Sequence, residues 1–203
     1  KAEPHFSFDN NSWLFPSTES EYRKGIVYLQ RYLHRLSNPG DPGAQFYTRA
    51  DNLNDLLSVV GKRLGSLSQR LNASVGELRI NTALAGDSAA RQATATPGSL
   101  IVRTPWMQID NVFYESRGYV WALLEVLRAV NIDFHGVLQK KNAVASLRQV
   151  ILLLQQSQVE PSSPIVLNGA PMGWMANYSK TMVSYISPAN AAIIDLRNLL
   201  AQG

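Results

Sequence analysis

Apolar residues recur at intervals of three and four over most of the chain, which is the spacing that puts side chains on one face of an α-helix. The densest example is the stretch 110–130. Its apolar face is wider than a single stripe, so we expect a central helix on which other helices pack. The residues of this face are Phe113, Val120, Leu123, Leu124, Val126, Leu127 and Val130.

The same spacing predicts four more helices. The first opens at Thr18, where Glu21 completes a capping-box pattern, and the last opens at Ser187–Pro188, an N-cap followed by proline at the first helical position. The short link after the first helix predicts antiparallel pairing with the second. The other two predicted helices run from Phe46 or Tyr47 to Leu71 and from about Phe134, behind an Asp133 cap, to Gln158.

The helical pattern breaks down in residues 72–109. Glu77–Ile80 has the composition of a short strand or a turn. Ser99–Thr104 has that of a brief strand, which Pro105 ends. We therefore predict a mainly α fold, an antiparallel bundle of four or five long helices with an irregular middle excursion and at most a small β element. We expect residues 1–203 to form one soluble domain that carries an aromatic arm at residues 1–17.

Composition narrows the class of function. The chain has 45% hydrophobic residues, enough for a core, and 19 Lys and Arg against 15 Asp and Glu. Because these basic residues are dispersed, nucleic-acid binding is disfavoured. The absence of cysteine excludes disulfides, a thiol nucleophile and thiolate metal ligands. No apolar run approaches the roughly 18 residues of a membrane span, so we expect contact with a membrane only through an N-terminal anchor upstream of Lys1.

Familiar catalytic patterns are missing from the sequence. His5, His34 and His135 lie far apart, and none has metal-ligand spacing to a carboxylate. No nucleophile elbow, phosphate-binding loop or dinucleotide fingerprint is present. We predict no catalytic residue, no metal and no cofactor. The sequence does not specify the oligomeric state.

Arg117 is the polar residue that stands out, because its spacing from Phe113 and Val120 directs it toward the apolar face of its helix. A guanidinium there needs a carboxylate or carbonyl partner. We favour a salt bridge that fixes helix register, and keep an anion-binding or catalytic role, with Glu115 as a neighbour, as the alternative. The candidate ligand-binding residues are Arg117, Tyr114, Asp51 and Asp55.

Two segments are candidates for partner binding. In the N-terminal arm, Trp13 and Phe15 either tuck onto the helices, which we favour, or form an exposed aromatic surface. In Asn168–Trp174, Gly169 and Gly173 let backbone approach a partner while Met172 and Trp174 offer adaptable apolar contact. Packing of this loop against the bundle is again the favoured interpretation.

Three motifs resemble the landmarks of a known family in the same order. They are Asp9–Leu14, Asp110–Gly118 and Val166–Pro171, and the similarity includes the Ala50–Leu53 start of the second predicted helix. The chain resembles the bacterial domain of unknown function 2333 family, and it is short for that family, which points to a reduced segment after the arm. The resemblance implies a proteobacterial envelope protein with one N-terminal membrane helix followed by a soluble helical domain, and it implies no activity.

Our leading hypothesis is therefore a non-enzymatic interaction or scaffold module with a possible protein partner, tethered to the inner membrane and facing the periplasm. The alternative is a small-ligand carrier or an enzyme with a pocket near Arg117.

Overall fold

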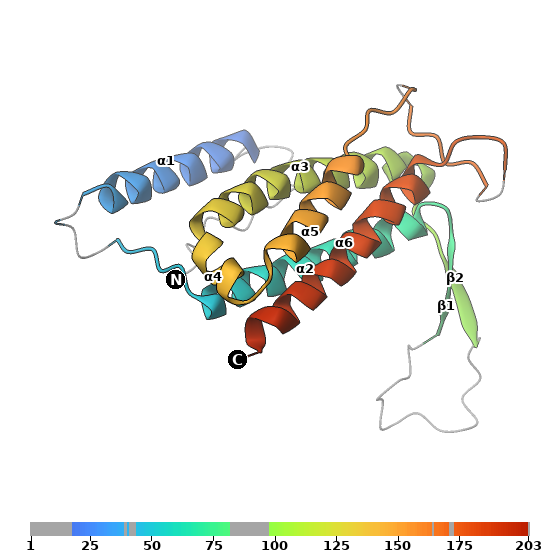
Figure 1. The fold of residues 1–203 in the computed structure, drawn as a ribbon. Helices are drawn as coiled ribbons and strands as arrows, with labels where there is room; N and C mark the ends of the chain where they lie inside the picture. Colours follow the sequence, from blue (N-terminus) through green and yellow to red (C-terminus); the bar gives the residue numbers. More distant parts are fainter. Residues whose placement is uncertain are drawn as a thin grey trace, which may run out of the picture. The chain divides into compact units, whose positions relative to one another are not determined.

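A computed structural model describes residues 18–38, 40, 44–81, 98–163, 165–170 and 173–202. The chain divides into two compact units, Lys1–Tyr47 and Thr48–Gly203. The first contains α1 (Thr18–Leu36). The elements of the second, shown in Figure 1, are α2 (Ala50–Ala73), β1 (Glu77–Ile80), β2 (Ser99–Val102), η2 (Trp106–Gln108), α3 (Ile109–Asp133), α4 (His135–Lys140), α5 (Val144–Gln156) and α6 (Tyr178–Ala201).

The predicted mainly α fold is confirmed. In the described ranges the only sheet is a two-stranded antiparallel ribbon in which Glu77 pairs with Val102 and Ile80 with Ser99. Both strands fall in the excursion where the sequence places them.

Helices α2 and α6 form an antiparallel seam in the second unit. Three polar contacts mark it from end to end: Arg197 Nε donates to Asn54 Oδ1 at 3.2 Å, the Ser68 and Ser187 hydroxyls lie 2.7 Å apart, and Lys180 Nζ donates to Asn72 Oδ1 at 2.8 Å. Leucines of α2 fill the space between these contacts, as their spacing predicts. The buried leucines are Leu53, Leu57, Leu64, Leu67 and Leu71.

The central helix is α6, which packs along both α2 and α5, rather than the stretch 110–130. Side chains of α6 that recur every three or four residues are buried, while α3 exposes Trp121 and also Val126, which we had placed on the buried face. The rest of the predicted apolar face of α3 is buried, and it is wider than a single stripe, as predicted. The buried hydrophobic residues of α6 are Met182, Ile186, Ala189, Ile193, Leu196 and Leu200.

The glycines of α2 face α6. A Cβ added at Gly61 would lie 3.5 Å from Asn190 Oδ1 and from Ile193 Cγ2. A Cβ added at Gly65 would lie 3.6 Å from Asn190 Nδ2. These are ordinary contact distances, so the seam would accept a methyl group at either position.

Two predicted helices differ from the structure in their extent. Helix α2 begins at Ala50 rather than at Phe46 or Tyr47, because Arg49 still has extended backbone angles of −111° and 151°. The predicted helix 134–158 is split into α4 and α5 at Asn142, whose φ of 51° lies in the left-handed region. Ala143 N donates to Leu138 O at 2.8 Å across this turn, the bond of a Schellman helix end. The expected Asp133 cap is the last residue of α3, and Phe134 precedes α4 without a side-chain cap.

The start of α6 is the largest error of the sequence interpretation. The helix begins at Tyr178, ten residues before Pro188, and Asn177 caps it by accepting a hydrogen bond from Lys180 N. Pro188 thus lies inside the helix, and Ser187 contacts Ser68 across the seam rather than serving as an N-cap. Tertiary packing of the apolar stripe on both sides of Pro188 outweighs the backbone hydrogen bond that the proline removes.

Replacing Pro188 by alanine should stabilise the second unit, by roughly 1 to 3 kcal/mol, because alanine restores a backbone donor and has the higher helix propensity. Pro188 is exposed, so little packing is lost. Urea unfolding followed by circular dichroism measures the change. A helix that instead began at Pro188 would lose its preferred first residue, and the variant would then unfold at a lower urea concentration.

Helix α1 is amphipathic, and its apolar side chains at Ile26, Leu29 and Leu33 are exposed. The side chains of the predicted Thr18–Glu21 capping box lie outside the described residues, as does the aromatic arm. Within the residues searched, no helix is both long and apolar enough to cross a membrane.

Candidate functional site

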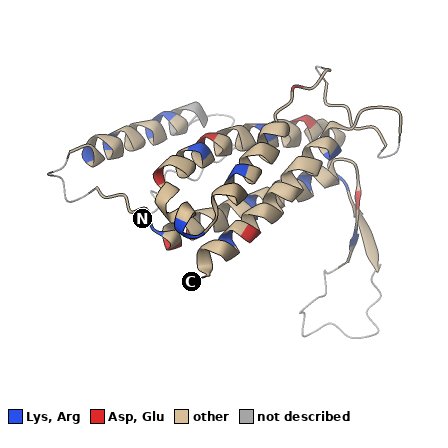
Figure 2. Cartoon of the chain, viewed as in Figure 1, with Lys and Arg blue, Asp and Glu red and all other residues tan. Residues whose placement is uncertain are grey.

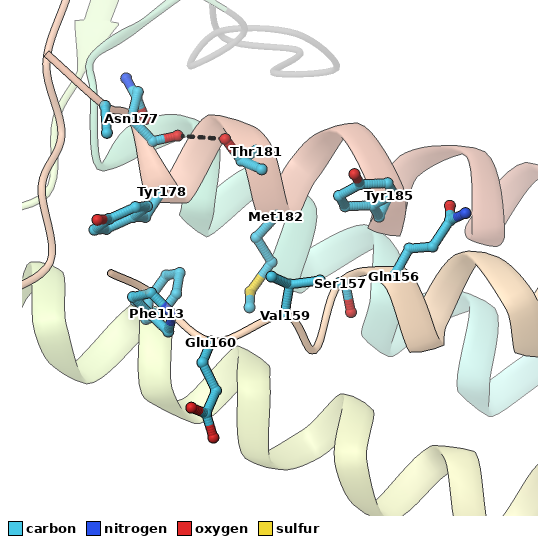
Figure 3. A pocket seen from close by; sticks show the side chains of 12 residues that line it. Phe113, Gln156, Ser157, Val159, Glu160, Asn177, Tyr178, Thr181, Met182 and Tyr185 are labelled. Carbon is cyan, nitrogen blue, oxygen red and sulfur yellow. Dashed lines mark hydrogen bonds between the residues drawn. The ribbon is translucent and has the colours of Figure 1, made fainter. Parts of the chain in front are cut away.

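A cavity of about 260 Å³ opens where α5 ends and α6 begins (Figure 3). The first turns of α3 close one side and the first two turns of α6 close another. Its walls are chiefly apolar, with polar groups interspersed. The apolar lining comprises Phe113, Val159, Pro161, Ala176, Tyr178, Met182 and Tyr185, and the polar lining comprises Gln156, Ser157, Glu160, Asn177 and Thr181.

The depth of the cavity is built from buried aromatic and thioether groups. Phe113 and Met182 are almost fully buried. The ring of Tyr178 lies 6.4 Å from that of Phe113 at an interplanar angle of 45°. At the outer end of the cavity, the side chain of Val159 is 75% exposed. The cavity therefore extends from a buried apolar interior to an open rim.

Arg117 fixes the segment that follows α5. Its Nη1 donates to Val159 O at 2.8 Å and its Nη2 to Gln158 O at 2.9 Å. These carbonyls lie just beyond the C-terminus of α5, where helical backbone acceptors lack internal partners and a cation is favoured. The partners are thus backbone carbonyls beside the pocket, rather than the carboxylate of the salt bridge that we favoured.

The other predicted ligand-binding residues fall into two separate places. Tyr114 stands beside Arg117 on α3, half exposed, with its ring edge-on to Phe113 at 5.3 Å. Asp51 instead accepts two hydrogen bonds from Arg49, and these hold the pKa of its carboxyl below the usual value, with help from the Asn52 amide. Asp55 is exposed one turn further along α2.

The structure thus brings Tyr114 and Arg117 together near the pocket and leaves the two aspartates elsewhere. Asp51 lies twelve residues, about 18 Å at 1.5 Å per residue, along α2 from Arg63. It is Arg63 that contacts α3 beside the predicted site, through Glu115.

Glu115 is held by two arginines of α2. Its carboxylate oxygens lie 2.9 Å from Arg63 Nη2 and 2.7 Å from Arg70 Nη2. The hydrogen bond from Arg70, followed by the charges of both arginines, lowers the pKa of Glu115, against the opposing effect of partial burial. Burial also raises the pKa of Tyr119, whose ring Arg63 overlies at 5.7 Å. This cluster joins α2 to α3.

The segment between α5 and α6 is anchored at its base. Asn168 and Asn177 form an antiparallel bridge, Asn177 Nδ2 donates to Gly169 O at 2.6 Å, and Tyr178 N donates to Leu167 O at 2.8 Å. Gly169 is required there, because an added Cβ would lie 2.6 Å from Met175 O. The space beside Gly169 is therefore filled by backbone of the same loop, rather than by a partner.

Trp174 projects from this anchored loop. Its side chain is 96% exposed, so the favoured interpretation of a packed loop does not describe this residue. Met175 is partly exposed beside it, and Ala176 and Asn177 lead directly into the pocket wall. Trp13, Phe15 and Met172, the other predicted partner-binding residues, lie outside the described residues.

The sequence interpretation missed the α6 wall of the pocket. Tyr178, Met182 and Tyr185 are spaced four and three apart, which is a helical signal. It was masked by the assignment of the helix start to Pro188. Among the residues that the structure covers, no three His, Asp or Glu side chains gather closely enough to hold a metal ion.

Replacing Arg117 by methionine should destabilise the second unit by about 1 to 3 kcal/mol, because two backbone carbonyls lose a charged donor. The matched control is Arg148→Met, at an exposed position of α5. Urea unfolding of both variants measures the difference. Equal stability of the two would mean that Arg117 does not hold the segment after α5.

Replacing Glu115 by glutamine should lower stability at pH 7 by about 1 kcal/mol, the scale of two partly exposed ion pairs. Because folding lowers the pKa of Glu115, its contribution is present above the ordinary carboxyl pKa and is lost as pH falls through the folded value. Stabilities of wild type and variant should therefore converge as pH falls below the ordinary carboxyl pKa and through the lowered folded value. The control is Glu125→Gln, at an exposed pair within α3, and an equal loss there would contradict a special role for Glu115.

Comparison with known proteins identified one family. The sequence pattern described as "Uncharacterized protein conserved in bacteria (DUF2333)" matches residues 1–203. No curated protein and no solved structure matched the chain.

Proposed function

The chain belongs to the DUF2333 family of uncharacterised bacterial proteins, and we propose that it serves as a non-enzymatic interaction module whose pocket receives an apolar side chain of a partner protein. The observation that carries this proposal is a pre-formed apolar cavity with large exposed side chains beside it, Val159 at the rim and Trp174 on the adjoining loop. Buried pockets flanked by exposed aromatic groups are where binding energy concentrates in protein interfaces.

The size of the cavity favours a side chain over a whole cofactor. Its volume of about 260 Å³ lies below the roughly 300 to 1,000 Å³ of pockets that enclose drug-sized ligands. The polar side chains of Asn177 and Thr181 at its wall are engaged with backbone groups of the protein itself, so the cavity offers a partner chiefly apolar contact. Figure 3 shows both near the start of α6, above Met182.

Rigidity of the pocket supports the same proposal. Arg117 fixes one wall and the Asn168–Asn177 bridge fixes the loop that carries Trp174. A site whose walls are held before binding loses less conformational freedom when the partner arrives. Arg117 is a positioning residue on this view, because its donors are engaged with the protein backbone.

The second candidate function is the binding of a small apolar ligand in the same cavity. The position of the cavity beside the segment that Arg117 holds favours this candidate. Glu160 is the charged side chain among the lining residues of the cavity. Because its charge is negative, such a ligand would be neutral or cationic. A stabilising shift in unfolding temperature with small apolar compounds, together with no protein partner, would select this candidate.

We further propose that the domain acts in the bacterial envelope, on the periplasmic side of the inner membrane. The support is the resemblance of its motifs to the family, which implies an N-terminal membrane helix ahead of the helical domain. The partner is accordingly sought in the native envelope.

Site-specific photo-crosslinking tests the docking site. A benzophenone side chain placed at Trp174 of the full-length protein should yield one reproducible protein adduct in native membranes. Thr181→Trp, which fills the pocket from an exposed helix position, should abolish that adduct. The matched control is the same photoreactive group at Trp121, which is also exposed but lies on α3.

Two results would contradict the proposal. One is the same set of adducts from position 121 as from position 174. The other is an adduct that persists after the pocket is filled in a variant whose circular dichroism is unchanged. Either would mean that the cavity does not select the partner.

A further inference from the structure

Helix α1 separates apolar from basic side chains around its axis. Tyr22, Ile26, Leu29, Leu33 and Leu36 recur at four and three, so they share one face at 100° per residue. Every one of them is an exposed side chain. The three that recur nearest the middle, Ile26, Leu29 and Leu33, are 53%, 55% and 60% exposed. The first unit thus presents a continuous apolar stripe about four turns long.

The remainder of the helix has an excess of basic residues. Helix α1 carries four Lys and Arg residues against Glu19 and Glu21 at its start, and it has no Asp or Glu between Tyr22 and Leu36. Lys24, Arg31 and Arg35 recur at seven and four along one side of the polar face, and Arg23 lies on its other flank. Figure 2 shows these basic positions along α1.

Tyrosines border the apolar stripe. Tyr22 lies within the stripe and Tyr32 beside it. Tyr28 lies on the polar side of the helix, with the Arg31 guanidinium 5.9 Å from its ring centre. Tyrosine has an apolar ring and a polar tip, and it concentrates where hydrocarbon meets water. Arginine and lysine can likewise lay their apolar stems along such a boundary while their charges reach lipid phosphates.

Charge decides which partner fits this face. Residues 48–203 carry fourteen Lys and Arg against ten Asp and Glu, so the second unit is itself net basic. A second copy of the chain would bring like charge to the basic face of α1. An anionic surface complements it, and a flat hydrocarbon boundary matches a long narrow stripe better than a discrete pocket does.

We propose that α1 binds the surface of an anionic phospholipid bilayer, with its axis parallel to the membrane and its apolar stripe at the level of the acyl boundary. Binding joins apolar burial with attraction of Arg23, Lys24, Arg31 and Arg35 to lipid phosphate. The proposal goes beyond the pocket at the α5–α6 junction and does not depend on it.

The absence of cysteine from the chain permits a direct test. The full chain is made as Leu33→Cys, on the apolar stripe, and as Gln30→Cys, on the polar face, and each is labelled with an environment-sensitive fluorophore. Vesicles of phosphatidylcholine containing phosphatidylglycerol should shift the emission of the probe at position 33 to the blue and leave that at position 30 nearly unchanged. Vesicles of pure phosphatidylcholine should give a much smaller response.

A charge variant tests the electrostatic part by co-sedimentation of unlabelled protein with the same vesicles. Lys24→Gln, Arg31→Gln and Arg35→Gln combined should weaken partitioning by about fivefold per removed charge, on the order of a hundredfold in total. Rising salt should weaken binding of the wild type in the same direction.

Three outcomes would overturn the proposal. Both probes could stay unchanged at saturating anionic lipid while unlabelled protein fails to sediment. The probe at position 33 could be blue-shifted already without lipid, which would place the stripe against protein. Binding could also be equal for neutral and anionic vesicles, which would remove the role of the basic residues. None of these results bears on the Trp174 crosslink.

Discussion

The antiparallel packing of α6 against α2 is the interaction on which the rest of the second unit depends. The two helices are joined by polar contacts at both ends and the middle, and leucines of α2 meet the isoleucines and small residues of α6 between them. Burial of such side chains is worth about 1.5 to 3 kcal/mol each. This apolar seam is long enough to keep α6 helical through Pro188, where local preference alone would begin a new helix.

The pocket follows from how this seam ends. Helix α6 continues upstream of Pro188 to Asn177, so its first turns extend to the end of α5 and face the start of α3. The chain must then cross from Gln156 to Tyr178 without regular helix. Arg117 secures the first part of that crossing and the Asn168–Asn177 bridge secures the last. The space between the three helix ends is what remains as a cavity, and Trp174 is displayed at its side.

Sequence periodicity predicted what local pattern can determine. The leucines of α2, the strand at Ser99, whose end was placed two residues late, and the mainly α fold follow from spacing and side-chain type. Glu77–Ile80 proved to be a strand where the pattern left a strand or a turn open. The start of α6 did not follow, because the serine and proline at 187 and 188 give a strong local signal that only contacts with a distant helix overrule. The turn at Asn142 was missed because the apolar spacing continues across it.

The candidate site was predictable only in part, for a related reason. The spacing around Arg117 showed that this side chain turns inward, but its partners are backbone carbonyls some forty residues away, and no sequence pattern specifies such acceptors. Asp51 looked available from its helical position, yet its neighbour Arg49 engages it. Exposure of Trp174 depends on how the loop base closes on Gly169, which is likewise a property of the folded chain.

The most direct test of an open apolar pocket is the methyl NMR spectrum of the protein labelled at its four methionines. Met182 lines the cavity and Met107 is exposed on η2, so the two report on the pocket and on the general surface. Indole, the side-chain analogue of tryptophan, is added stepwise. The account predicts a saturable shift of the Met182 methyl signal while that of Met107 stays in place. Equal and unsaturable shifts at both, or none at Met182, would contradict it.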